Sequence, residues 1–120
     1  MCCRICVVVL IGSLAISGCS KGKSTDVMIG DLSSTNEVVR IKAVRLLSQR
    51  KGDSAKVVPA LIESLKSKDA DIRWSAAIGL GYFGDEAKTA LPALEEAQRD
   101  KDARVREGAR IAISRIEGKK

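Results

Sequence analysis

A repeat of 33 residues constrains the fold of this chain more than any other feature of its sequence. Aliphatic–Arg pairs, alanines and prolines recur at this spacing: Val39-Arg40, Ile72-Arg73 and Val105-Arg106; Ala43, Ala76 and Ala109; Pro59 and Pro92. Periods of about 20–50 residues are typical of arrays whose units bury their apolar faces against one another. The 120 residues therefore predict one domain of stacked units.

Each unit has the pattern of a pair of helices. Ile72, Ala76, Leu80 and Phe83 follow the spacing i, i+4, i+8 and i+11, which places them on one helical face. Aromatic residues make up only 2% of the chain, so Ala, Val, Ile and Leu must build the core, and this composition favours close-packed helices. The predicted fold class is all-α.

Residues suited to helix ends occur at fixed positions in the repeat. Three favoured N-cap residues precede the aliphatic–Arg pairs: Asn36, Asp69 and Asp102. Three glycines stand where a first helix would end in a left-handed conformation: Gly52, Gly84 and Gly118. The pairs Gly52-Asp53 and Gly84-Asp85 are then expected to cap and start the second helix of their units.

The repeat resembles the HEAT repeat, in the short HEAT-like class of phycobilisome lyases. The residues that carry the resemblance include Asp69 to Arg73, Leu80-Gly81, Gly84-Asp85, Ala90 to Leu94 and Asp102 to Arg106, and it extends over residues 26–117. It implies a short right-handed α-solenoid of antiparallel helix pairs. A solenoid of this kind serves many functions, so the resemblance by itself names no partner.

The N-terminus resembles the signal of a bacterial lipoprotein. Arg4 precedes an apolar run, Ile5 to Ile16, that is shorter than the roughly 20 residues of a membrane-spanning helix. The run ends in Ile16-Ser17-Gly18-Cys19, which is similar to a lipobox, and the resemblance implies lipidation of Cys19. We expect a signal peptide over 1–18, a lipidated cysteine and tether over 19–25, the repeat domain over 26–117 and a basic tail over 118–120.

The same resemblance gives a location. It implies the bacterial cell envelope, with the chain held at a membrane through Cys19. Ser20 follows the cysteine, which in that family points to the outer membrane, facing the periplasm, where the cell has one.

Arg40, Arg73 and Arg106 form a row with two interpretations. In HEAT arrays the equivalent arginine commonly pairs with Asp side chains or carbonyls of a neighbouring turn, and Asp69 and Asp102 are available here. We expect a structural ladder, with contact to a partner as the alternative.

Trp74, Ile78 and Tyr82 form an apolar stripe at i, i+4 and i+8, off the core face of their helix. The corresponding positions of the other units also hold Arg, Gln and Glu, which predicts a solvated surface, and they include Ile41 and Ile111. An exposed apolar patch tends to mark a contact site. The alternative is that Trp74 folds over its neighbours as an extension of the core.

The composition excludes several kinds of chemistry. The chain contains no His, so catalysis by His and metal sites built on imidazole are excluded. Adjacent Glu95 and Glu96 point different ways on a helix and make a poor catalytic pair. We expect no enzyme activity, no cofactor and no metal site.

The sequence therefore predicts a non-catalytic protein-interaction or scaffold module, anchored by lipid in the cell envelope. One alternative is an accessory subunit of a chromophore- or cofactor-handling enzyme of the phycobilisome-lyase kind. The net charge of +6 allows a nucleic-acid binder as a second alternative, but only if the signal is false, so no nucleic acid is expected. The predicted partner is an unidentified protein or a second copy, because the stripe and the outer flank of the last helix would otherwise expose apolar surface.

Overall fold

A computed structural model describes residues 23–119 as a series of helices joined by short turns. The α-helices are α2 (Thr25–Asp31), α3 (Glu37–Ser48), α4 (Ser54–Ser64), α5 (Ala70–Phe83), α6 (Leu91–Ala97) and α7 (Ala103–Ile116). Two 3-10 helices, η1 (Lys51–Asp53) and η2 (Gly84–Ala90), precede α4 and α6. These residues contain no strand.

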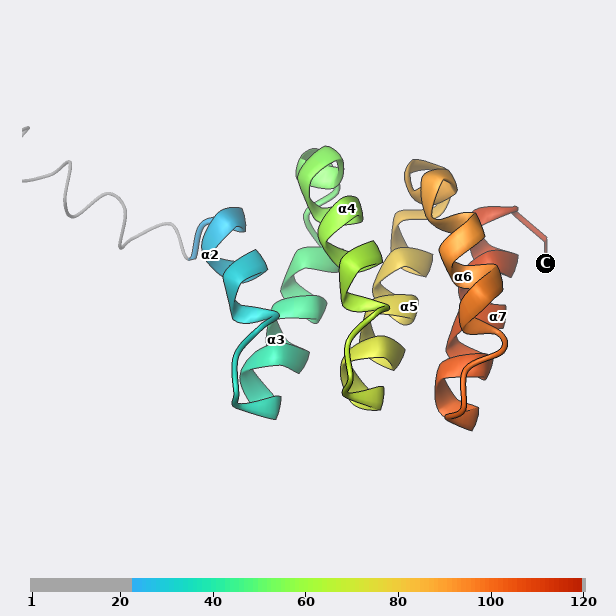
Figure 1. The fold of residues 1–120 in the computed structure, drawn as a ribbon. Helices are drawn as coiled ribbons and strands as arrows, with labels where there is room; N and C mark the ends of the chain where they lie inside the picture. Colours follow the sequence, from blue (N-terminus) through green and yellow to red (C-terminus); the bar gives the residue numbers. More distant parts are fainter. Residues whose placement is uncertain (1–22, 120) are drawn as a thin grey trace, which may run out of the picture.

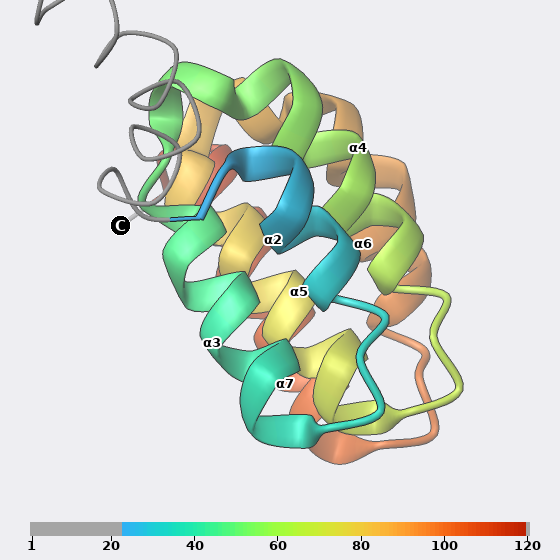
Figure 2. The ribbon, with the colours of Figure 1, turned by 90° about the vertical axis from the view of Figure 1, so that its left-hand side faces the viewer.

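The helices form two layers (Figure 1). One layer contains α2, α4 and α6, and the other contains α3, α5 and α7. The end-on view in Figure 2 shows α3, α5 and α7 stacked behind one another, so consecutive units lie side by side. The predicted all-α solenoid is confirmed.

The repeated N-cap residues begin the helices of the second layer. The side-chain oxygen of Asn36 accepts a hydrogen bond from the Val38 amide at 2.9 Å. Asp69 accepts from the Asp71 amide at 2.9 Å, and Asp102 accepts from the Arg104 amide at 2.8 Å. These bonds satisfy amide groups that have no partner within the helix, and so fix where each helix starts.

The core lies between the two layers and consists of small and aliphatic side chains. Leu47, Leu61, Leu80 and Leu94 are completely buried. Alanines and glycines fill the close contact between α5 and α7, where a Cβ added to Gly81 would lie 3.0 Å from Ala112 Cα. Interiors at crystal-like density have no room for an extra methyl group, so the small residues set the spacing of these helices.

Two of the three expected glycines follow their helices with positive φ. Gly84 and Gly118 have φ of 55° and 67°, but the ψ of Gly84, −127°, lies outside the left-handed helical region. Gly52 does not have positive φ, because α3 ends at Ser48 and the chain turns through η1, in which Gly52 lies. Unit one has an extra residue before its glycine, and the 3-10 turn accommodates it.

Asp53 and Asp85 were expected to cap the second helix of each unit, and this is wrong. Asp53 precedes α4 without a side-chain bond to its amide groups and instead accepts a hydrogen bond from Thr25 Oγ1. Asp85 lies inside η2. The second helices start through 3-10 turns, which leave no position for a side-chain cap.

The proposed lipid anchor lies outside the described residues. These residues include neither Cys19 nor the predicted signal of residues 1–18. Within 23–119, no helix has the length and apolar character needed to cross a membrane.

Candidate functional site

A groove of about 590 Å³ lies between α3 and α5, in the layer formed by α3, α5 and α7. Its floor consists of the buried residues Val44 and Ser48 from α3 and Ser75 and Gly79 from α5. Its sides are the half-buried residues Ile41 and Ile78. Its rim consists of exposed residues: Arg45, Gln49, Trp74 and Tyr82. The groove is mainly apolar and open to solvent.

The groove lies beside a close contact between α3 and α5 at Gly79. A Cβ added to Gly79 would lie 3.0 Å from Val44 Cγ1 and 3.0 Å from Ser48 Oγ. The larger side chains of both helices lie outward of this contact and form the sides. On its other flank α5 packs more extensively, against α7, where Gly81 and Gly108 allow closer approach.

Trp74 both packs on a neighbour and borders the groove. A Cβ added to Gly108 would lie 3.0 Å from Trp74 Cδ1, so the indole covers this glycine of α7. The side chain still remains 37% exposed. Trp74 therefore fits both sequence interpretations: one part of the indole extends the core over Gly108, and the exposed part borders the groove as a contact site.

Tyr82 is the most exposed aromatic side chain of the described residues, at 55%. The guanidinium carbon of Arg115 lies 5.2 Å from the centre of its ring. A cation over an aromatic face is attracted by the electrons of the ring. This contact with α7 orients Tyr82 at one end of the groove.

The groove has one charged lining residue, Arg45, and no carboxylate among its lining. Within residues 23–119, Arg45 makes neither a hydrogen bond nor an ion pair with another side chain. Ser75 Oγ, at the floor, is buried and has no hydrogen-bond partner. The Ser75 hydroxyl is thus unpaired, whereas most buried polar groups in proteins have partners.

The structure brings four of the five predicted contact residues together. Ile41, Trp74, Ile78 and Tyr82 all line the same groove. Ile111 does not line it; this residue is half-buried on α7.

The flank of α7 that faces away from α5 is polar, which corrects the expectation of an open apolar edge. On the packing side of α7, Val105, Ala109, Ala112 and Ile116 are buried and Ile113 is half-buried. At the positions equivalent to Trp74 and Ala77, α7 carries Glu107 and Arg110, which pair with each other at 2.5 Å. The expectation failed because most apolar residues of α7 pack against the other helices, and Ile111 and Ile113 are themselves half-buried.

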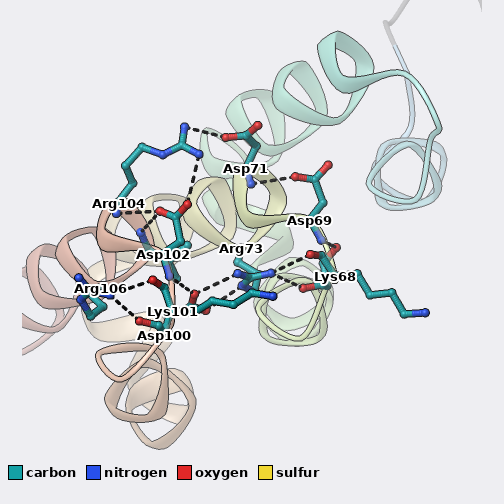
Figure 3. Close-up of polar contacts among 11 residues, drawn as sticks. Lys68, Asp69, Asp71, Arg73, Asp100, Lys101, Asp102, Arg104 and Arg106 are labelled. Carbon is teal, nitrogen blue, oxygen red and sulfur yellow. Dashed lines mark hydrogen bonds and ion pairs between the residues drawn. The ribbon is translucent and has the colours of Figure 1, made fainter.

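The arginine row lies along the turns before the helices and connects neighbouring units. Arg40 donates to Asp69 at 2.5 Å and to the Ser34 carbonyl at 2.7 Å. Figure 3 shows the next rung, in which Arg73 donates through two nitrogens to the carboxylate of Asp100, at 2.7 and 3.0 Å. Arg40 and Arg73 therefore each join their own turn to the following unit.

The second rung is nearly buried, and its two charges stabilise each other. The side chains of Arg73 and Asp100 are 8% and 12% exposed. The hydrogen bond to Asp100 raises the pKa of the Arg73 guanidinium, and the hydrogen bond from Arg73 lowers the pKa of the Asp100 carboxyl. Both groups are held in their charged forms by this pairing.

Asp102 and Arg106 do not form a third rung of the same kind. Asp102 caps α7 and lies within 3.5 Å of Arg104, and it makes no bond to Arg73. Arg106 donates to the carbonyls of Asp100 and Lys101 at 2.8 and 3.1 Å and remains exposed. The sequence pattern did not single out Asp100, because it lies two residues before the cap that the repeat makes conspicuous.

A second hollow lies between α2 and α4, in the other layer, and is lined in part by Glu63 and Lys66. These two residues pair with each other at 3.1 Å, so the charges there are already satisfied. Among the described residues, no group of three or more His, Cys, Asp or Glu side chains is placed to hold a metal ion.

Several groove residues were missed by sequence reasoning. Ser75 and Gly79 are small residues at i and i+4, a spacing that favours close helix contact but is indistinguishable from ordinary packing in the sequence. Val44 and Ser48 were missed for the same reason, since they lie on the core side of α3.

Comparison with known proteins gives one match. A protein-family model described as HEAT repeats matches residues 26–114. No curated protein matches the chain.

Proposed function

Because the chain belongs to the HEAT-repeat family, whose repeats generally mediate protein–protein interaction, we propose that it is a non-catalytic interaction module anchored in a bacterial envelope. The observation that carries this proposal is the groove between α3 and α5. It combines exposed aromatic side chains with two half-buried isoleucines, an arginine and one unpaired buried hydroxyl, that of Ser75. Aromatic and arginine residues are the types most enriched at protein interfaces.

The anchor is supported by the sequence pattern that ends at Cys19. Two or more acyl chains hold a protein stably at a membrane, whereas one chain binds only marginally. Residues 19–25 connect the cysteine to the start of α2 and contain small and polar residues, a composition typical of a flexible tether. The groove would then meet its partner at the surface of the membrane, at the outer membrane where the cell has one.

Site-specific photocrosslinking in intact cells tests the proposal. A photoreactive residue is placed at Gln49, on the groove rim, and in a separate strain at Glu95, which is exposed on α6 in the other layer. An interaction module gives a discrete protein adduct in the membrane fraction from at least one position. An adduct of twice the mass identifies a second copy of the chain as the partner.

The proposed function is contradicted if neither position, nor a third at Arg110 on α7, yields an adduct above the background without irradiation. Co-purification of a tetrapyrrole with an absorbance band in the visible range would instead favour the chromophore-handling alternative.

A further inference from the structure

The floor of the groove contains a buried hydroxyl group with no partner. Ser75 is 6% exposed, and its Oγ makes no hydrogen bond. Ser48, the other serine of the groove lining, donates to the Val44 carbonyl at 2.7 Å and is satisfied. Leaving a buried polar group unpaired is costly, but the Ser75 Oγ atom is closed to solvent, so the side chain would have to rotate before a ligand could bond to it.

The charge of the groove determines which charge on a ligand it favours. Arg45 is the only charged residue of its lining, and it has no acidic partner within residues 23–119. A second guanidinium, that of Arg115, lies over the Tyr82 ring at the groove end. Cations without counterions beside an apolar surface favour carboxylates and disfavour basic groups.

The dimensions of the groove suit a helix. Each wall extends over nine residues, from Ile41 to Gln49 and from Trp74 to Tyr82, a rise of about 12 Å or two helical turns. Side chains at i and i+4 of an added helix lie one turn apart and would reach Ile41 of one wall and Ile78 of the other. The walls are helices whose backbone groups bond internally, so an extended peptide would find no strand edge to pair with.

We propose that the groove between α3 and α5 binds an acidic amphipathic helix of a protein partner. Aliphatic side chains at i and i+4 of that helix pack on Ile41 of one wall and Ile78 of the other, and a neighbouring carboxylate pairs with Arg45. The inference rests on the proposed function and adds the chemistry of the partner and the surface that receives it.

The test uses a displayed library of 16-residue amphipathic helices. All members carry leucines at i and i+4, and the flanking positions are randomised among Glu, Lys, Gln and Ser. The full-length chain is presented in nanodiscs of neutral phosphatidylcholine, so that lipid charge does not select the peptides. The best-enriched peptide is then synthesised and titrated, with the emission of Trp74, the only tryptophan of the chain, as the readout.

The expected result is enrichment of Glu beside the leucines and a change in Trp74 emission on binding. Arg45→Glu weakens binding at least about tenfold and shifts the selection toward Lys. Ile78→Glu also weakens it, because a charge then lies between the aliphatic walls. Lys42→Glu is the matched control: it makes the same charge change on the same helix, at an exposed position outside the groove, and should alter affinity less than about twofold.

The inference is overturned if no helix is enriched, if basic helices are enriched, or if Arg45→Glu and Lys42→Glu have equal effects. These outcomes are separate from failure of the proposed function. Adducts from Glu95 or Arg110 alone would keep the interaction module and exclude this groove, whereas the absence of adducts at every position would contradict both.

Discussion

At the scale of single residues, the Arg40–Asp69 and Arg73–Asp100 ion pairs differ in how completely they are satisfied. Asp100 receives two bonds from Arg73 and a third from the Asp102 amide at 2.9 Å. Arg40 reaches only one oxygen of Asp69, and its Nε is buried without a partner. The second rung therefore holds its units together more firmly than the first.

Arg73→Ala is expected to destabilise the chain by about 3–5 kcal/mol, because it leaves the nearly buried Asp100 carboxylate without its counterion. Arg40→Ala removes the same number of atoms but leaves Asp69 37% exposed, so water can solvate the carboxylate and the expected loss is about 1 kcal/mol. Urea unfolding followed by circular dichroism measures both values. Equal losses would show that the difference in burial has no energetic consequence.

The same pair predicts the response to acid. Arg73 lowers the pKa of Asp100 in the folded chain below its value in the unfolded chain. A carboxyl of this kind contributes stability that is present above the unfolded pKa, about 3.9, and is lost as the pH falls through the folded pKa. We expect the free energy of unfolding to fall below about pH 4, and to fall less steeply in Asp100→Asn.

Urea titrations at pH 7, 5, 4 and 3 measure this dependence. Asp100→Asn should be less stable than the wild type at pH 7, and the two should converge in acid. Parallel curves for the two proteins below pH 4 would assign acid sensitivity to other carboxyls.

At the scale of helices, two glycines differ in how much room their surroundings leave for a side chain. A Cβ at Gly81 would lie 3.0 Å from the backbone Cα of Ala112, which cannot move without shifting α7. Gly30, on α2, has no atom within 4 Å of the place where a Cβ would be added. One glycine sets the distance between helices, and the other only weakens its own helix.

Gly81→Ala is therefore expected to destabilise the chain by about 1–3 kcal/mol, because the added methyl group separates α5 from α7. Gly30→Ala should stabilise it by about 0.5–1 kcal/mol, since alanine is the better helix former. Thermal unfolding of the two variants measures both changes. Stabilisation by Gly81→Ala would mean that α5 and α7 are less closely packed than in this structure.

At the scale of the whole molecule, the proposed lipid anchor would decide where the groove can act. Cys19→Ala should abolish labelling by a radioactive fatty acid and release the chain from membranes or block its maturation. Cys6→Ala is the matched control, since it removes a thiol within the predicted signal and should retain the label. Equal labelling of the wild type and Cys19→Ala would refute the lipoprotein interpretation.

The sequence by itself determined the helices and their stacking. The period of 33 residues, the N-cap residues Asn36, Asp69 and Asp102, and the alanine-rich faces act locally or between adjacent units, so their spacing predicts the solenoid. It also singled out Trp74, Ile78, Tyr82 and Ile41, because an apolar side chain at a position that elsewhere holds Arg or Glu stands out.

The tertiary structure alone decided which residues face one another across two helices. The groove depends on the distance that Gly79 allows between α3 and α5, and the partner of Arg73 depends on how the turn before α7 places Asp100 beside it. It also decided that Ile111 lies outside the groove and that α7 presents paired charges on its free flank. Spacing along one chain fixes the faces of a helix, but the rotation and separation of neighbouring helices arise from the packing of many side chains at once.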